Sequence, residues 1–195
     1  MFEIEKKAHV LDEKKVLSEL YNFADFVHFV QKNDVYYSRE ISENRYISCR
    51  IRTEIEKTEF GEKRTNFFTY KKKENRISEN GAKIEVNDEK ETEILSEEPL
   101  KIFLEDSGFK INLQKQKKVH TFTTQTELGK CNLELCDVFP LGYFLEIEIL
   151  CKDDSESTVK KANEIIKSFF EKCKISENQI EERYYSEMLK SVKIS

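Results

Sequence analysis

Two glycine-rich phosphate-binding motifs are missing from this chain of 195 residues, which has only five glycines. Neither a Gly-x-x-x-x-Gly-Lys loop nor a Gly-x-Gly-x-x-Gly turn occurs, so the sequence gives no support to a P-loop or a Rossmann fold. The histidines His9, His28 and His120 do not stand near a serine or cysteine in a nucleophilic pattern, and we expect them to be structural or exposed. Any phosphate binding must come instead from a local cluster of positive charge.

Cysteine pairs, excess positive charge and long apolar runs are also lacking. The five cysteines are odd in number and show no Cys-x-x-Cys spacing, which argues against a disulfide framework or a zinc site. The net charge of -5 offers no basic surface for nucleic acid. No apolar run approaches the roughly 20 residues of a membrane span, and acids and lysines enter too early for a secretory leader. We therefore expect a cytoplasmic protein without a nucleic-acid or membrane partner.

The rest of the composition is that of a folded protein, with 36% charged and 38% hydrophobic residues. Periodicity predicts strands at 1–10, 35–37, 46–53, 65–73, 82–86, 109–119, 120–127, 131–139 and 142–151. It predicts helices at about 12–30, at 89–106 with a bend at Pro99, from Ser155 or Ser157 onward, and at 178–192. This order predicts a single α+β domain over residues 1–195, built on an antiparallel sheet large enough to close.

Charged residues two apart recur inside five strand-like stretches, at 3–7, 50–52, 71–73, 115–117 and 146–148. Successive side chains of a strand point to opposite faces, so each pair projects from one face. In the first, third and last stretches the opposite face is apolar, as expected for a surface packed against helices. A sheet closed on itself, with a charged interior, explains this pattern and suits a polyanion with metal ions.

The basic members of these pairs come from three predicted strands and are Arg50, Arg52, Lys71, Lys73, Lys115 and Lys117. In a shared interior their repulsion and desolvation would cost several kcal/mol for each unpaired ion, so they require an anionic partner such as phosphate. The alternative is an exposed strand face, where lysine and arginine are common. That alternative is equally good for Lys71 and Lys73, but weaker for Arg50 and Arg52 because the residues that alternate with them are apolar.

The acidic members form two pairs from opposite ends of the chain, with one further acid nearby: Glu3, Glu5, Glu146, Glu148 and Asp137. Oxygen ligands without histidine or cysteine suit Mg²⁺ or Mn²⁺, held by carboxylates together with substrate phosphates. The alternative is edge-strand charge that discourages aggregation. Two such pairs, accompanied by a matching basic set, favour the metal site.

The same residues carry a family resemblance. The stretch Glu3-Ile4-Glu5-Lys6-Lys7 resembles the ExExK signature of the CYTH superfamily, also called triphosphate tunnel metalloenzymes. Further segments that match in the family's order lie at 31–37 (QKNDVYY), 49–52, 69–71, 115–117 and 135–148 (LCDVFPLGYFLEIE). Within the superfamily, the asparagine–aspartate–tyrosine stretch, the GYFLEIE strand and the segment 185–189 look most like class IV adenylyl cyclases.

The resemblance implies an eight-stranded antiparallel closed β-barrel with external helices, a triphosphate bound in its interior, and a homodimer. It implies that Glu3, Glu5 and Glu148 are metal ligands, with Glu146 and Asp137 near them. It implies that the phosphates are held by Lys7, Arg50, Arg52, Lys71, Lys115 and Lys117. Lys117 stands where the family usually has arginine, which removes a bidentate phosphate contact. The resemblance assigns no role to Arg76, Lys83 or Glu85.

Three functions remain open at this point. In the first, ATP is cyclised to cyclic AMP as the ribose 3′-oxygen attacks the α-phosphorus and pyrophosphate leaves, with Lys7 and Glu5 as the catalytic candidates. In the second, the same site hydrolyses tripolyphosphate, thiamine triphosphate or a nucleoside triphosphate. In the third, the protein binds a nucleotide or polyphosphate without catalysis. For the enzymes, catalysis would consist mostly of positioning and charge neutralisation.

Overall fold

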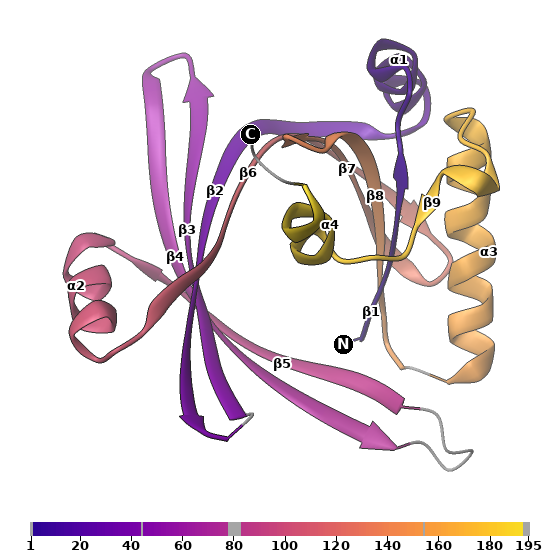
Figure 1. The fold of residues 1–195 in the computed structure, drawn as a ribbon. Helices are drawn as coiled ribbons and strands as arrows, with labels where there is room; N and C mark the ends of the chain where they lie inside the picture. Colours follow the sequence, from indigo (N-terminus) through magenta and orange to yellow (C-terminus); the bar gives the residue numbers. More distant parts are fainter. Residues whose placement is uncertain (1, 44, 78–82, 154, 193–195) are drawn as a thin grey trace. The chain divides into compact units, whose positions relative to one another are not determined.

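The computed structural model describes residues 2–43, 45–77, 83–153 and 155–192, without the side chains of Thr58 and of residues 71–89. Figure 1 shows the described elements, which form an α+β fold with an antiparallel sheet, as the sequence predicts. In chain order these elements are β1 (Phe2–His9), α1 (Glu13–Phe23), β2 (Asp25–Ser42), β3 (Arg45–Thr58), β4 (Gly61–Ile77), β5 (Lys83–Ile94), α2 (Glu98–Asp106), β6 (Lys110–Thr126), β7 (Gly129–Phe139), β8 (Gly142–Cys151), α3 (Glu156–Lys172), a 3-10 turn (Glu177–Gln179), β9 (Ile180–Glu181) and α4 (Tyr185–Ser191).

The strands hydrogen-bond in the order β5-β4-β3-β2-β6-β7-β8-β1-β9. The pairs β1–β8, β1–β9, β7–β8, β3–β4 and β4–β5 are antiparallel. Among the described residues β5 and β9 are the two edges of this order, and no hydrogen bonds join them. The sheet therefore has nine strands in an open order, and the closed eight-stranded barrel stays a prediction.

The chain divides into two compact units. The terminal unit contains Met1–Val30 and Lys117–Ser195, and the middle unit contains Gln31–Gln116. The strands β2 and β6 each contribute residues to both units. The prediction of one domain over residues 1–195 is not tested by this division, and each unit is described by itself below.

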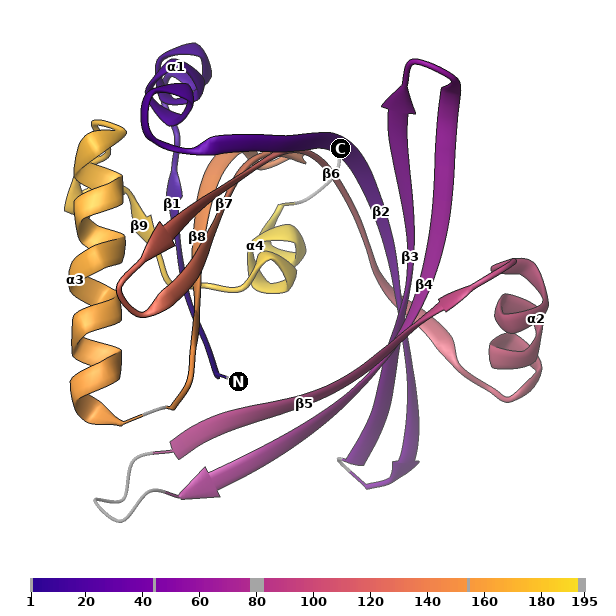
Figure 2. The ribbon, with the colours of Figure 1, turned by 180° about the vertical axis from the view of Figure 1, so that it is seen from behind.

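In the terminal unit the β-sheet has one apolar and one charged face. The apolar face includes Ile4 of β1, Leu133 and Leu135 of β7, and Leu145, Ile147 and Ile149 of β8. It packs against α1 through Val16 and Leu20, and against α3 through Ala162, Ile166, Phe169 and Phe170. Figures 1 and 2 show α3 on this side of β1 and β8, and α4 on the other side. The prediction of a helix-covered face opposite the paired charges is confirmed for this unit.

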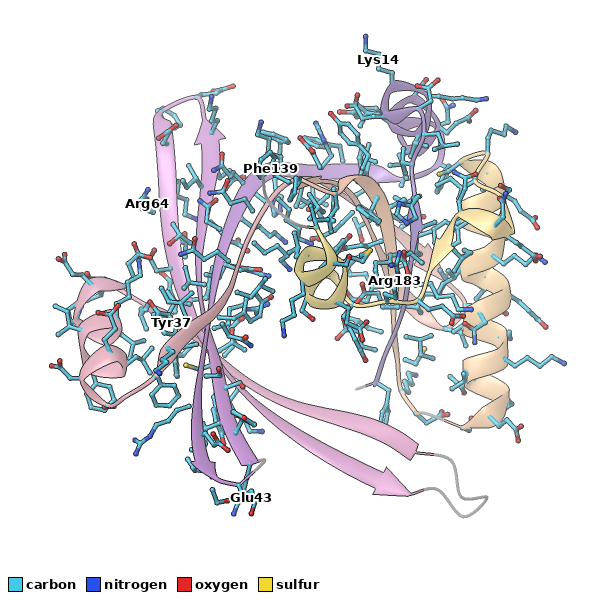
Figure 3. All side chains as sticks on the ribbon, viewed as in Figure 1. Lys14, Tyr37, Glu43, Arg64, Phe139 and Arg183 are labelled. Carbon is cyan, nitrogen blue, oxygen red and sulfur yellow. The ribbon has the colours of Figure 1, made fainter. Side chains whose placement is uncertain are left out.

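In the middle unit, β3 pairs with β4 and β4 pairs with β5 along long antiparallel ladders. Its buried cluster joins Tyr37 of β2, Cys49 and Ile51 of β3, and Leu104 of α2. Tyr37 points toward α2 in Figure 3. The alternation of apolar and charged residues in Cys49–Arg52 therefore sends the two arginines to the face away from α2.

Three predicted helices were wrong in extent. The first ends at Phe23, because the aromatic and β-branched run 26–30 belongs to β2. The segment 89–106 is a strand to Ile94 and a helix only from Glu98, where Pro99 lies in the first turn and does not bend the helix. The last predicted helix, 178–192, is a 3-10 turn, the short strand β9 and the helix α4.

Two strand predictions also differ from the structure. The segments 109–119 and 120–127 form one continuous strand, β6, and the strand predicted at 35–37 is the middle of the longer β2.

No helix of the described residues is long and apolar enough to cross a membrane. All five cysteines lie among the described residues, where they are buried and form no disulfide.

Candidate functional site

Four carboxylates share the charged face of the terminal unit. In the β1–β8 ladder, Glu5 lies directly across from Glu148, and Lys7 lies across from Glu146. Glu3 is two residues before Glu5 and therefore projects to the same face. We call Glu3, Glu5, Glu146 and Glu148 the acid row. Residues directly across an antiparallel ladder have Cβ atoms about 4.5–5.5 Å apart, so like charges there repel unless a cation lies between them.

The pKa values of Glu5 and Glu148 are both raised in this crowded and partly buried row. Burial and the nearby charges of Glu146 and Glu3 raise the pKa of Glu5 to about 7. Burial and the charge of Glu3 also raise the pKa of Glu148 to about 7, although a hydrogen bond from Asn132 works in the opposite direction. The Glu5 side chain is nevertheless exposed to solvent. A carboxylate set that is hard to ionise by itself and open to solvent is suited to binding a cation.

Lys117 of β6 lies in a second group of the same unit. Its Nζ donates hydrogen bonds to Glu146 Oε2 at 2.9 Å and to Glu134 Oε2 at 3.0 Å, and it lies 3.6 Å from Cys136 Sγ. Burial would raise the pKa of Glu146, but the Lys117 ammonium and the Tyr185 hydroxyl outweigh this effect and hold it below its usual range. Lys117 therefore interacts with acids, whereas the resemblance assigned it to phosphate.

The C-terminal segment lies on the charged face. Strand β9 pairs with β1 so that Glu181 lies across from Lys7. In α4, the ring of Tyr185 packs edge-on against Phe144 with ring centroids 5.1 Å apart, and Lys7 Nζ lies 5.5 Å from the centre of the Tyr185 ring. These neighbours of Lys7 are acids and an aromatic ring. Its predicted roles as a catalytic residue and as a phosphate ligand are not tested by these contacts.

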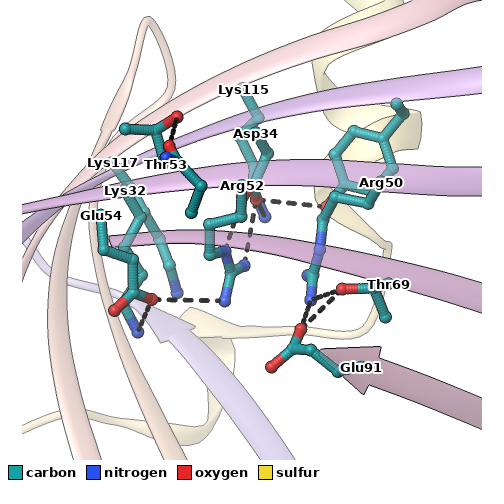
Figure 4. A network of polar contacts seen from close by, with 12 residues as sticks. Lys32, Asp34, Arg50, Arg52, Thr53, Glu54, Thr69, Glu91, Lys115 and Lys117 are labelled. Atoms are coloured by element: carbon teal, nitrogen blue, oxygen red, sulfur yellow. Dashed lines mark hydrogen bonds and ion pairs between the residues drawn. The ribbon is translucent and has the colours of Figure 1, made fainter. Parts of the chain in front are cut away.

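The middle unit holds a second site, centred on Asp34 of β2 (Figure 4). Arg52 donates to this carboxylate through Nε at 2.6 Å and Nη2 at 3.1 Å, and Lys115 Nζ lies 3.1 Å from Oδ2. The Tyr36 hydroxyl donates to Oδ2 at 3.3 Å. Burial would raise the pKa of Asp34, but its hydrogen bond with Arg52 and the charge of Lys115 hold it well below its usual range. Arg52 and Lys115 are thereby fixed in place by one ionised carboxylate.

Arg50 lies beside this site on the same strand as Arg52. Its Nη2 donates to Thr69 Oγ1 at 3.0 Å and to Glu91 Oε2 at 2.9 Å, and the Thr69 hydroxyl donates to the same Glu91 oxygen at 2.6 Å. The Arg50 side chain is only 9% exposed, and among the described residues its Nε has no acceptor. A buried donor without an acceptor carries a desolvation cost that an anion can relieve.

The structure brings most of the predicted site residues together in two sets. The terminal unit holds Glu3, Glu5, Lys7, Lys117, Glu146 and Glu148, and the middle unit holds Arg50, Arg52 and Lys115. The side chain of Lys71 lies outside the described residues, although its backbone pairs with Ser48. The side chains of Arg76, Lys83 and Glu85 also lie outside the described residues.

Asp137 is not brought to the acid row. It lies across from Tyr143 on β8, an odd number of residues from both Glu134 and Glu146, so it projects to the opposite face of the sheet. Its charge acts on Tyr143, whose pKa it raises. The structure therefore gives no support to Asp137 as a member of the predicted metal site.

Three residues that the sequence did not single out belong to these sites. Asp34 holds the cations of the middle unit, while Glu134 and Tyr185 contact Lys117 or Lys7 in the terminal unit. The sequence could have identified Asp34 and Glu134 as site residues, because each alternates with other polar residues at the same two-residue spacing. For Tyr185 only the resemblance of segment 185–189 pointed to a role.

A groove of about 1020 Å³ in the terminal unit lies away from this chemistry. Its lining includes Lys6 of β1, Lys167 and Phe170 of α3, and Ile180 of β9. Lys6 alternates with Glu5 and Lys7 and so lies on the opposite face of β1. The groove is therefore a feature of the helix-covered side and is separate from the acid row.

Neither a protein-family model nor a curated protein matches the sequence, but solved structures do. A protein of Pyrococcus horikoshii is 22% identical, with a TM-score of 0.70 over 96% of this chain and 98% of its own. A proposed adenylate cyclase of Vibrio parahaemolyticus is 19% identical, with a TM-score of 0.71 over 98% of this chain and 99% of its own. A proposed adenylyl cyclase of Hippeastrum, described as revealing a dominant triphosphatase activity, is 13% identical, with a TM-score of 0.58 over 97% of this chain and 94% of its own.

The chain therefore has the fold of these proteins along nearly its whole length. Two of the three are described as adenylate or adenylyl cyclases, the group within the CYTH superfamily that the sequence motifs resemble most. These similarities show a fold shared with proteins that are described as cyclases, as the resemblance predicts.

Proposed function

We propose that this protein is a metal-dependent enzyme that acts on a triphosphate, and that its reaction is the cyclisation of ATP to cyclic AMP and pyrophosphate. The observation that carries the proposal is the register of β1 and β8, which sets Glu5 across from Glu148 and Lys7 across from Glu146. The fold shared with two proposed cyclases supports the same reaction. The closed eight-stranded barrel predicted from the sequence is part of this proposal.

The acid row fits Mg²⁺ or Mn²⁺. Its donors are carboxylate oxygens, which hard divalent cations prefer. Burial and then mutual repulsion raise the pKa of Glu5 and Glu148, and a bound cation opposes both effects. Glu3, Glu5 and Glu148 would hold the ion, with Glu146 shared with Lys117. When bound, the ion supplies positive charge for the phosphate oxygens and the leaving pyrophosphate.

Within the middle unit, a separate set of cations is suited to binding phosphate. Arg50 and Arg52 present guanidinium groups, which bind phosphate in a bidentate manner, and Lys115 adds a point charge. The unpaired Nε of Arg50 is a donor for a phosphate oxygen. Asp34 keeps Arg52 and Lys115 oriented before a substrate arrives, so that little reorganisation is needed on binding.

Hydrolysis of the triphosphate is the second candidate reaction, and one observation favours it. The Hippeastrum protein with the same fold is described as revealing a dominant triphosphatase activity. The same carboxylates and cations would serve a water molecule as the attacking group, because positioning and charge neutralisation are common to both reactions.

Products distinguish the two reactions. We expect purified protein incubated with ATP and Mn²⁺ or Mg²⁺ to release cyclic AMP and pyrophosphate without orthophosphate. Orthophosphate from ATP or tripolyphosphate would instead establish the hydrolase. If neither product forms but tripolyphosphate raises the melting temperature, the protein is a binding module and the proposal is wrong.

The proposal also includes a homodimer in the cytoplasm. Sedimentation equilibrium of the full chain, with and without ATP, measures the mass in solution. A mass equal to one chain of 23.2 kDa at all concentrations would contradict the dimer without bearing on the reaction.

A further inference from the structure

The Lys117 cluster has the dimensions of a metal site. The ligand atoms of Glu134, Cys136 and Glu146 all lie within 4.8 Å of one another, which is close enough for a single ion to contact all three. The three residues come from adjacent strands, with Glu134 directly across from Glu146 and Cys136 two residues farther along the same face of β7. Two carboxylates and a thiol are ligands that Zn²⁺, Co²⁺ and Cd²⁺ accept.

A cation from the protein itself already occupies this cluster. The Lys117 ammonium lies 2.9 Å from a Glu146 oxygen, 3.0 Å from a Glu134 oxygen and 3.6 Å from the Cys136 sulfur. The Lys117 side chain is 7% exposed, against 21% for Glu134 and 11% for Glu146. An ammonium is a compact point charge, so it fits a space of this size, which a planar guanidinium does not match.

We propose that the Lys117 ammonium is the resident cation of the cluster formed by Glu134, Cys136 and Glu146, and that it excludes divalent metal ions from this cluster. Divalent ions are thereby confined to the exposed part of the acid row, at Glu3, Glu5 and Glu148. The two positions differ in burial and in ligand chemistry, because the acid row offers oxygen alone whereas the Lys117 cluster adds sulfur. Filling the second position with an ammonium excludes thiophilic ions and leaves a site for Mg²⁺ or Mn²⁺.

The contacts of the Lys117 ammonium explain why a second cation is excluded from this cluster. A divalent ion and this ammonium cannot share the cluster without strong repulsion, because both would need the same two carboxylate oxygens. The inference goes beyond the proposed function, because it concerns cation binding without any triphosphate.

Titration with Co²⁺ shows directly whether a metal ion has entered the cluster. A thiolate bound to Co²⁺ gives a charge-transfer absorption band that carboxylate ligands do not give. The test titrates Co²⁺ into five metal-free proteins: the wild type, Cys136→Ser, Lys117→Met, Lys117→Met with Cys136→Ser, and Lys118→Met. The last is the matched control, because Lys118 is the next residue on β6 and is exposed. Far-UV circular dichroism and a thermal melt establish that each variant is folded.

We expect no thiolate band in the wild type or in Lys118→Met. Lys117→Met should gain the band, with Co²⁺ bound about tenfold or more tightly than in the wild type, since the competing ammonium is removed from between the carboxylates of Glu134 and Glu146. The double variant should lose the band again, which assigns it to Cys136.

A thiolate band in the wild type that Cys136→Ser removes would overturn the proposal, because the ammonium would then not exclude metal. A folded Lys117→Met that gains no band would overturn it as well. If Lys117→Met does not fold, the wild-type titration with its Cys136→Ser control still decides the question. None of these results depends on whether the protein cyclises or hydrolyses a triphosphate.

Discussion

The guanidinium of Arg52 and the carboxylate of Asp34 form a bidentate ion pair, and the side chain of Asp34 has no exposed surface. The guanidinium donates to both carboxylate oxygens, at 2.6 and 3.1 Å, and the side chain of Arg52 is 15% exposed. The pKa of Arg52 is raised by this partner and that of Asp34 is lowered, so both groups stay charged over the working pH range. Asp34 holds one edge of the Arg52 guanidinium, and Nη1 on the other edge lies 3.8 Å from Glu54 Oε1.

Replacing Asp34 with alanine should destabilise the protein by about 3–5 kcal/mol, because it removes the buried carboxylate that the Arg52 guanidinium and the Lys115 ammonium both contact. The loss should be largest near neutral pH. A carboxyl whose pKa is lowered by folding adds stability above its unfolded value of about 3.9, and this contribution fades as the pH falls further. Urea unfolding at pH 7 and at about pH 3, below the unfolded value, measures both effects.

Asp25→Asn is the matched control for this experiment, since Asp25 is an exposed acid at the start of the same strand. We expect its effect to stay within about 0.5 kcal/mol. If Asp34→Ala costs no more than this control, the ion pair does not organise the middle unit. Its proposed role in orienting Arg52 for a phosphate would then have no basis.

Sequence alone predicted the acid row because its signal is local. Each Glu-x-Glu pair occupies one face of its strand, and the apolar residues between the acids, such as Ile4 and Ile147, identify the buried face. The helix α3 was predicted for the same reason, since its apolar residues recur at helical spacing. Local periodicity thus predicts which residues share a face, although it does not identify their partners on other strands.

Partners on other strands could not be predicted from periodicity. Lys117 shares the spacing of the predicted phosphate ligands, yet its ammonium binds Glu134 and Glu146, which are distant in the chain. Asp137 stands among acids in the sequence, but a difference of three residues from Glu134 sends it to the other face. The segment 178–192 has a helical composition, and its pairing with β1 depends on a contact about 170 residues away in the chain.

Glu5→Gln should lower the turnover of the enzyme roughly a hundredfold or more, because it removes a carboxylate from the acid row. The same change should raise the melting temperature of the metal-free protein at pH 8 by a few degrees. Folding raises the pKa of Glu5 to about 7, so its neutral form is favoured, and stability is lost as the pH rises toward and through 7. Glutamine is neutral at every pH and avoids this loss.

Product assays and thermal melts at pH 5 and pH 8 check both parts of this prediction. The control is Glu62→Gln, which alters an exposed acid at the start of β4. The stability gain should be much smaller at pH 5, which lies just above the ordinary glutamate pKa of 4.5, so that little of the loss has accumulated. Full turnover by Glu5→Gln would contradict the site assignment, whereas an unchanged melting temperature at pH 8 would contradict only the crowding of charges.

Mn²⁺ should bind more tightly as the pH rises from 6 to 8. Glu5 and Glu148, each with a pKa of about 7, are mostly protonated at pH 6 and mostly ionised at pH 8, and a metal ligand must be ionised. We expect the affinity to rise about tenfold or more, with protons released on binding. Calorimetric titration in two buffers of different ionisation enthalpy measures both quantities. Equal affinity at pH 6 and pH 8, with no proton release, would place the ion elsewhere.

Tyr185→Leu should lower turnover while costing only about 1–3 kcal/mol of stability. Leucine keeps part of the apolar packing but loses the ring that lies edge-on against Phe144 and beneath the Lys7 ammonium. Lys7 would then be free to adopt other rotamers, which should reduce kcat more than it changes KM.

Tyr185→Phe keeps the ring, so its turnover should lie closer to the wild type. Tyr184→Leu is the control, because that neighbouring ring is 56% exposed. Steady-state kinetics and thermal melts of the three variants decide the matter: if Tyr185→Leu reduces kcat no more than Tyr184→Leu does, the aromatic contact does not position Lys7.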